Sequence, residues 1–310
     1  MPKPTLFRTG AQYEIAAGDY RATVSELGAG LRSLTYRGEP VIAGYDADAV
    51  PPAGAGQLLL PWPNRIDHGR YQFGSGSYQL DISEPARDTA IHGLTRFVSW
   101  QTAGHAPDQV ALRLTLLGRP GYPFCLELQA AYRLTAAAGL EVTITAANPG
   151  SSAAPFGTGS HPYLRAGDSL VDAWQLEVPG RRWLPTDDRG IPSGEPQPVT
   201  GTPYDFTQQR AIGATRMDTA FTDLVADGDG RIRATVTGQL ARLTLWAGPG
   251  YRWLQVFTGD PLGPDSRRRA LAVEPMTCPP NAFVTGTDLV TIEAGDSQSW
   301  QWGIQAAPAG

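Results

Sequence analysis

Residues Phe124–Leu134 read FCLELQAAYRL and alternate between apolar and mostly polar side chains. Successive side chains of a β-strand point to opposite faces, so this alternation is typical of a strand with one buried face. The same pattern recurs in four other segments, at 110–116, 140–146, 232–236 and 300–304. Half-buried strands of this kind are characteristic of antiparallel sheets, and the sequence therefore predicts an all-β fold.

Turn-forming residues separate these apolar runs, as in Asn148-Pro149-Gly150 and Asp227-Gly228-Asp229-Gly230. No long, capped segment shows helical periodicity. The longest irregular stretch is 184–206, and neither composition nor periodicity changes after it. We therefore interpret 184–206 as a long functional or covering loop and expect one domain over residues 1–310.

Composition excludes several classes of function. The formal net charge of −5 gives no basic surface for nucleic acid or for an anionic membrane. No apolar run is long enough to span a membrane, and the N-terminus lacks a signal-peptide core, so we expect a cytoplasmic protein. Cys125 and Cys278 are the only cysteines, and nothing in their setting indicates a disulfide or a metal site. We expect a monomer.

One carboxylate stands out in Leu271–Phe283, which reads LAVEPMTCPPNAF. Glu274 follows a short apolar run and precedes Pro275, and proline interrupts a regular central strand. We therefore expect Glu274 at the stiff end of a strand, aimed into a cleft. Taken alone, a surface glutamate at a strand end is the commoner explanation of such a pattern.

Other polar residues interrupt apolar runs in a similar way. Asn64 and Arg65 follow Pro61-Trp62-Pro63, and the pair could bind a hydroxyl-rich ligand or pin a loop. His161 lies in Gly159-Ser160-His161-Pro162, where it could act as a general acid or base near neutral pH. His92 precedes Gly93; a lone histidine is more often structural than catalytic.

Two further residues carry open alternatives. Asp218 precedes a small apolar run and could bind a ligand or form a cap or turn. Gln255 interrupts an apolar strand, either as a buried contact or as its solvent-facing member. His68 and His105 lie in turn-like surroundings, and we expect both to be solvated.

Taken in order along the chain, these motifs resemble those of the aldose 1-epimerases, the galactose mutarotase-like enzymes, in their shorter bacterial form. The resemblance runs nearly end to end, and one departure is Leu164, where phenylalanine is common. Each motif is weak alone, and their order and spacing are specific. The matching segments are 28–34, Pro63-Asn64-Arg65-Ile66, His92-Gly93-Leu94, His161-Pro162-Tyr163-Leu164, Asp218 with Phe221, Gln255, and Glu274-Pro275.

The resemblance implies a large antiparallel β-sandwich that binds a small-molecule sugar in an open cleft. It implies that Glu274 is the base for the anomeric hydroxyl and that His161 is the acid for the ring oxygen. It also implies that His92 is a second histidine that contacts the ring oxygen or the anomeric region. Arg65 and Asp218 are then hydroxyl-binding residues, with Asn64 and Gln255 as supporting contacts. Such acid–base chemistry needs no cofactor and no metal, and the sequence predicts neither.

Other functions remain open at this point. The first is a 1-epimerase for an anionic sugar, a hexose 6-phosphate or a sulfosugar, with Arg267–Arg269 or Arg165 as the arginines facing the anion. The second is a non-catalytic carbohydrate-binding protein, which would not need the acid and the base. The third is a glycosidase that uses Glu274 and Asp218 as its two carboxylates.

Overall fold

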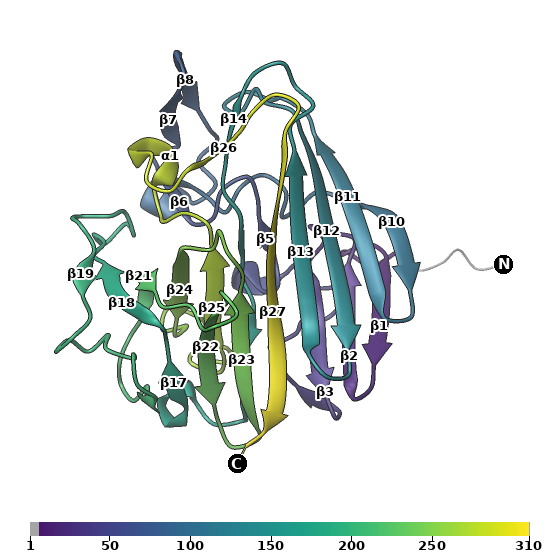
Figure 1. The fold of residues 1–310 in the computed structure, drawn as a ribbon, viewed down its shortest axis with the longest axis vertical. Coiled ribbons are helices and arrows are strands. Elements are labelled where there is room, and N and C mark those ends of the chain that lie inside the picture. The colour runs from purple at the N-terminus through teal and green to yellow at the C-terminus, as the bar shows by residue number, and fades with distance from the viewer. Residues whose placement is uncertain (1–5, 310) are drawn as a thin grey trace.

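The computed structural model describes residues 6–309 of the chain. Nearly all of its regular structure is β, as Figure 1 shows, and every pairing between named strands is antiparallel. Within 6–309 there is one four-residue α-helix, α1 (Ala282–Thr285), and three short 3₁₀ turns. The prediction of an all-β antiparallel fold is confirmed. The single domain over 1–310 stays a prediction, and residues 1–5 and 310 of it lie outside the described residues.

The largest sheet has nine strands, and its long central members run down the right half of Figure 1. In spatial order they are β10 (Gln101–Ala106), β11 (Gln109–Leu116), β12 (Leu126–Thr135), β13 (Gly139–Ala147), β27 (Ser297–Pro308), β23 (Ala241–Ala247), β22 (Ile232–Thr237), β17 (Gln175–Glu177) and β20 (Arg210–Ala211).

Three of the seven candidate residues, Asp218, Gln255 and Glu274, lie in a second sheet of eight strands. In spatial order they are β19 (Gln197–Pro198), β18 (Gly180–Leu184), β21 (Asp218–Leu224), β24 (Trp253–Phe257), β25 (Leu271–Met276), β15 (Gly159–Ser160) and β5 (Leu58–Leu59), with β16 (Tyr163–Leu164) also pairing with β25.

A four-stranded sheet and three small ribbons complete the fold. The four-stranded sheet packs its first two strands against β11 and β12. Its members are β1 (Gln12–Ala17), β2 (Tyr20–Ser25), β3 (Leu31–Tyr36) and β4 (Glu39–Pro40). The ribbons pair β6 (Arg65–Asp67) with β9 (Thr89–Ile91), β7 (Arg70–Phe73) with β8 (Gly76–Gln79), and β14 (Ala154–Phe156) with β26 (Val290–Ile292).

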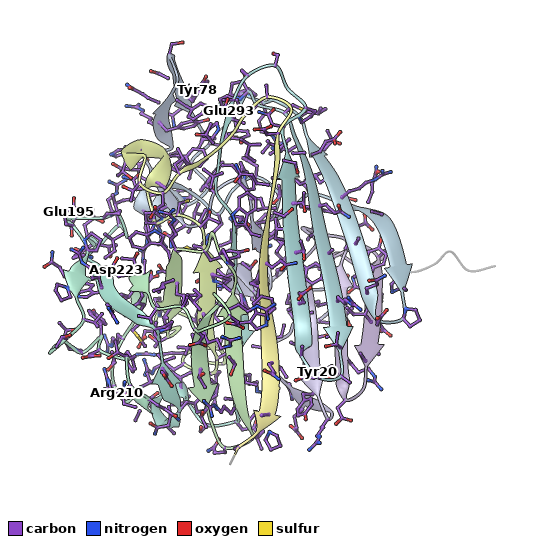
Figure 2. All side chains as sticks on the ribbon, viewed as in Figure 1. Tyr20, Tyr78, Glu195, Arg210, Asp223 and Glu293 are labelled. Carbon is purple, nitrogen blue, oxygen red and sulfur yellow. The ribbon has the colours of Figure 1, made fainter. Side chains whose placement is uncertain are left out.

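The core lies between these sheets, and alternation along the strands creates it. In β12 the side chains of Glu127, Gln129 and Arg133 are exposed on one face, whereas those of Leu126, Leu128, Ala130, Tyr132 and Leu134 are buried on the other. One apolar cluster contains Tyr132 of β12 together with residues of the four- and eight-stranded sheets. Figure 2 shows side chains filling the space between the sheets. At the lower end of this view the Tyr20 hydroxyl donates to the Ala306 carbonyl at 3.0 Å, and this bond connects β2 to β27. The predicted sandwich is thus held by apolar burial between layers.

The expectation that a strand ends at Glu274 is wrong. Strand β25 continues through Pro275 to Met276 and lies inside the sheet, with Pro275 opposite Leu254. The backbone N–H groups of Val273 and Thr277 point to the side of β15 and β16. A backbone N–H at position 275 would point to the same side. At that point the chain between β15 and β16 is not paired with β25. The proline therefore removes no hydrogen bond that the sheet needs.

Candidate functional site

Six of the seven residues singled out in the sequence line one pocket of about 310 Å³ on the eight-stranded sheet. This volume is at the small end of the range for ligand pockets and suits a single small molecule. The six are Asn64, Arg65, His92, His161, Asp218 and Glu274. The seventh, Gln255, lies directly behind the pocket wall, where it contacts Asp218.

Different parts of the fold supply these side chains. Glu274 lies in the interior of β25, opposite Gln255 of β24. His161 lies between β15 and β16, where the chain is not paired with β25. The same break in the pairing accommodates Pro275. The β6–β9 ribbon pairs Arg65 with Ile91 and thereby sets His92 beside Arg65.

Glu274 and His161 form the deepest part of the site. The Nε2 atom of His161 lies 3.3 Å from Oε1 of Glu274, and the two residues are only 5% and 2% exposed. The Oε2 atom of Glu274 has no hydrogen-bond partner among the described residues, which leaves it free for a ligand. The His161 ring stacks on Tyr163, with centroids 4.9 Å apart, and this contact orients it.

Burial disfavours the charged form of both groups. It raises the pKa of Glu274 well above its ordinary value, and nearby Asp218 adds to this rise while Arg65 opposes it. Burial likewise lowers the pKa of His161. A second proton on the pair would create a buried imidazolium, and loss of the last proton would create a buried carboxylate. The pair is therefore built to hold one proton across a wide pH range.

His92 is held in one tautomer. The backbone N–H of Asn64 donates to Nδ1 of His92 at 3.1 Å, so the proton of the neutral ring is on Nε2. Burial lowers the pKa of His92 well below its ordinary value, and the cation of Arg96 lowers it further. Next to it, Gly93 has φ of +73°, and a Cβ there would lie 2.0 Å from the Leu60 carbonyl oxygen. Only glycine fits this position, and it brings the histidine close to the pocket.

Arg65 is fixed by carboxylates on both sides. Its Nε and NH2 atoms donate to the two oxygens of Glu84 at 2.7 and 3.1 Å. Its NH1 atom lies 3.9 Å from Oδ2 of Asp218, whose side chain is 37% exposed. Burial alone would raise the pKa of Glu84, but the bonds from Arg65 hold it below its ordinary value. Arg65 is thus a preorganised donor rather than a mobile surface charge.

The sequence left Gln255 as either a buried contact or a solvent-facing residue of its strand, and in the structure it is buried. It is 3% exposed, and its Nε2 atom donates to Oδ1 of Asp218 at 2.6 Å. This bond orients the Asp218 carboxylate toward the pocket. Gln255 therefore acts through Asp218.

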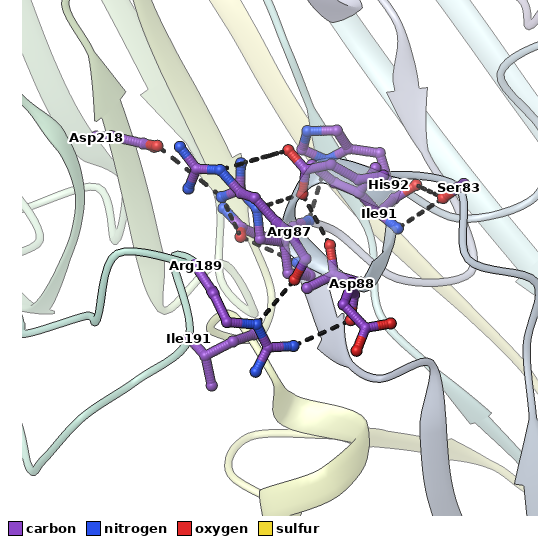
Figure 3. Close-up of polar contacts among 12 residues, drawn as sticks. Ser83, Arg87, Asp88, Ile91, His92, Arg189, Ile191 and Asp218 are labelled. Carbon is purple, nitrogen blue, oxygen red and sulfur yellow. Dashed lines mark hydrogen bonds and ion pairs between the residues drawn. The ribbon is translucent and has the colours of Figure 1, made fainter.

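The sequence did not single out four other parts of the site. Glu84 holds Arg65, Tyr163 supports His161, and Arg96 lines the pocket near His92. A tip of the predicted covering loop, 187–191, packs behind Arg65. Figure 3 shows Arg189 reaching the carbonyls of Arg87 and Asp88, at 2.9 and 3.0 Å. The histidine–proline–tyrosine motif gave a signal for Tyr163, and the irregular stretch 184–206 gave one for the loop tip; Glu84 and Arg96 had none.

Several sequence candidates lie elsewhere. His68 and His105 are exposed, as expected. Arg268 is buried, with ion pairs to Asp172 at 2.7 Å and Asp260 at 3.1 Å, and it has a structural role. Arg165 lines a neighbouring groove and pairs with Asp168 at 2.6 Å. Cys125 and Cys278 are both free thiols. No helix within residues 6–309 is long and apolar enough to cross a membrane.

Chemically, the pocket combines a buried acid–base pair with a rim of hydrogen-bond donors and acceptors. One proton can move between Glu274, His161 and a ligand held between them, while Arg65 donates and Asp218 accepts hydrogen bonds. Hydroxyl groups can use both functions, and the pocket therefore suits a polyhydroxylated ligand.

Comparisons with known proteins agree with this arrangement. A family model described as aldose 1-epimerase matches residues 11–305. The chain is 37% identical over 287 residues to the uncharacterized protein YihR of Escherichia coli K12, covering 93% of this chain and 90% of that protein. It is 28% identical over 292 residues to maltose epimerase of Levilactobacillus brevis, covering 86% and 83%. The fold matches a GalM/aldose epimerase homologue from C. elegans with a TM-score of 0.85 at 18% identity, covering 97% and 99%.

Proposed function

Because the chain belongs to the aldose 1-epimerase family, we propose that it is an isomerase that interconverts the α and β anomers of a free aldohexose such as glucose or galactose. The relative named maltose epimerase also supports a reducing sugar as the substrate class. The main observation behind this proposal is the buried pair of Glu274 and His161, 3.3 Å apart in a pocket lined by hydroxyl-binding groups.

The reaction consists of proton transfers and one reversible C–O cleavage. A base removes the proton from the anomeric hydroxyl O1 as an acid protonates the ring oxygen O5, and the C1–O5 bond breaks to give the open-chain aldehyde. Rotation about C1–C2 presents the other face of the carbonyl to the C5 hydroxyl. Ring closure then returns both protons, so the base and the acid exchange roles.

Glu274 is proposed as the base for O1 and His161 as the acid for O5. The pair must carry one proton as the ion pair of carboxylate and imidazolium when it acts in this direction. Burial favours the neutral pair, so donors on the sugar and the nearby cation of Arg65 must stabilise the carboxylate as the substrate binds. His92 is a third proposed catalytic group, since its Nε2–H can donate to the ring-oxygen region.

The remaining residues are proposed to bind sugar hydroxyls. Arg65 donates to hydroxyl oxygens, and Asp218 accepts from hydroxyl protons. Asn64 lies beside Arg65, its Oδ1 accepting the Arg65 backbone N–H at 3.0 Å, and so keeps the arginine in place. Gln255 supports Asp218 in the same way.

The experiment that tests this proposal is polarimetry on freshly dissolved α-D-glucose and α-D-galactose, with and without the protein. We expect faster relaxation to the same final rotation. The substitution Glu274→Gln removes the base but keeps the shape of the side chain, so the rate should fall by about 10²–10⁴-fold. Sugar binding should stay detectable by saturation-transfer NMR.

Two outcomes would contradict the proposal in different ways. Turnover like that of the wild type in Glu274→Gln would remove Glu274 from the role of base. Binding without any acceleration, for every aldose tested, would point instead to a non-catalytic carbohydrate-binding protein. An exposed substitution, Glu127→Gln on the outer face of β12, serves as the control for loss of one carboxylate.

A further inference from the structure

One cation in the pocket has no anionic partner. Arg96 lines the same pocket as Glu274 and His161, yet among residues 6–309 it forms no ion pair within 4.0 Å. Its two side-chain hydrogen bonds go to neutral acceptors, Oε1 of Gln57 at 3.3 Å and the Ile91 carbonyl at 3.2 Å. Its Nε atom is buried without a hydrogen-bond partner. A half-buried guanidinium with spare donors, facing a ligand pocket, is an unusual feature for a site that binds only neutral groups.

The fold holds this arginine in place. Gln57 is fully buried, and its amide donates to the Arg96 carbonyl at 3.3 Å while accepting from the Arg96 guanidinium. Burial lowers the pKa of Arg96 to about 10, with Glu84 opposing the shift, so the guanidinium is still charged at neutral pH. The two oxygens of Glu84 are both taken by Arg65. The Arg96 guanidinium carbon lies 5.2 Å from the centroid of the Phe97 ring, but no carboxylate of the described chain forms an ion pair with it, so its charge is available to a ligand.

The position of Arg96 relates it to one part of a sugar. Its cation lies close enough to His92 and His161 to add to the effect of burial on both rings. These histidines are the groups proposed to serve the ring oxygen, and Glu274 is the group proposed to serve O1. In a pyranose the ring oxygen joins C1 to C5. O1 and the substituent on C5 therefore lie on opposite sides of the ring oxygen. The Arg96 guanidinium donates to the carbonyl of Ile91, the residue before His92, so Arg96 lies beside a histidine proposed to serve the ring oxygen and can reach a substituent on C5.

We propose that Arg96 is a specificity-determining residue that binds an anionic group, a carboxylate, phosphate or sulfonate, on the C5 substituent of the aldose. This inference rests on the proposed epimerase function and names the class of aldose that fits the pocket best. It also assigns the anion site to an arginine other than those that the sequence suggested. Arg268 is neutralised by Asp172 and Asp260, Arg165 is paired with Asp168, and the exposed Arg267 and Arg269 do not line this pocket; Arg269 lines the neighbouring groove with Arg165.

The test compares kcat/KM for anomer exchange among four sugars: D-glucose, D-glucuronate, D-glucose 6-phosphate and 6-deoxy-6-sulfo-D-glucose. Exchange is measured by NMR, and the rate without enzyme is subtracted for each sugar. We expect at least one anionic sugar to exceed glucose by more than about 10-fold, because a hydrogen bond to a charged group contributes roughly 10- to 100-fold in affinity. Comparison of the three anions identifies which one is preferred.

Variants then assign the preference to one side chain. Arg96→Met should reduce the ratio of anionic to neutral kcat/KM by about 10- to 100-fold, and Arg96→Lys should restore part of it. Arg165→Met removes the same charge from the adjacent groove and should leave the ratio unchanged. A ratio that is unaffected by Arg96→Met, or a preference for glucose, would overturn the inference.

A measurement on the wild-type protein covers the case in which Arg96→Met does not fold. Methyl glycosides cannot open and act only as competitors, so methyl β-D-glucuronide is compared with methyl β-D-glucopyranoside. We expect the charged competitor to inhibit at a concentration at least about 10-fold lower, with weaker inhibition at high salt. Equal inhibition constants would overturn the inference. Turnover of glucose alone would refute only the anion site, whereas no turnover of any sugar would refute the epimerase function itself.

Discussion

At the residue scale, the site depends on where one proton resides. Glu274 and His161 were separate candidates in the sequence, at the two ends of a span of more than one hundred positions. In the structure they touch, and burial makes each resist its charged form. A general base in water needs no such partner. Here the carboxyl and the imidazole share a proton, so neither group has an independent protonation state.

The pH dependence of kcat/KM tests this sharing. A second proton on the pair blocks the base, and burial lowers the pKa of His161, so the acid limb should lie below its ordinary value of 6.5. Loss of the last proton removes the acid, and burial raises the pKa of Glu274, so the alkaline limb should lie well above 4.5. Anomer-exchange NMR across the pH range, with buffer catalysis subtracted, measures both limbs. An acid limb at or above 6.5 would contradict the buried pair.

At the element scale, the loop between β18 and β19 supports the site from behind. Gly190 has φ of +75°, and a Cβ there would lie 2.8 Å from NH1 of both Arg65 and Arg87. Gly201 belongs to the same irregular stretch and has φ of +76°, but a Cβ there meets nothing within 4 Å. The two glycines therefore share a backbone conformation and differ in what surrounds them.

Alanine substitutions at these two positions form a matched pair. Each should cost about 1–2 kcal/mol of unfolding free energy, because an L-residue is strained at positive φ. Only Gly190→Ala should displace Arg65, and weakening one of its hydrogen bonds should raise KM by roughly 2- to 10-fold. Thermal denaturation and the KM for the best sugar separate the two effects. An equal KM in both variants would show that the loop does not position Arg65.

At the scale of the whole molecule, the sheet edges argue for a monomer. Strand β10 forms one edge of the nine-stranded sheet; five of its six residues are exposed, and a bulge interrupts its pairing between Thr102 and Gly104. The other edges of the two large sheets, β20, β19 and β5, are two residues long. Short or bulged edges resist pairing with a second sheet. Light scattering after size exclusion should give a mass near 33.1 kDa, and a value near twice that would contradict the monomer.

The sequence by itself determined the strands and the chemistry-bearing residues. Alternation along a strand is a local property, because side chains at successive positions face opposite sides whatever the strand later packs against. Residues such as Tyr132 and Glu127 could therefore be assigned to a buried and an exposed face before the sheets were known. The motifs around His161 and Glu274 were visible for a similar reason, since glycine widens and proline restricts the local choice of backbone conformation.

Only the tertiary structure decided how distant groups were paired. Pro275 lies inside a strand because its missing donor falls at the gap between β15 and β16, and local rules contain no information about that neighbour. Gln255 is buried because it faces Asp218, and Arg268 is structural because Asp172 and Asp260 surround it. Arg96 differs from both, since no carboxylate of the described chain forms an ion pair with it. Pairing, burial and charge balance arise from contacts between segments far apart in the chain, and folding alone determines which segments meet.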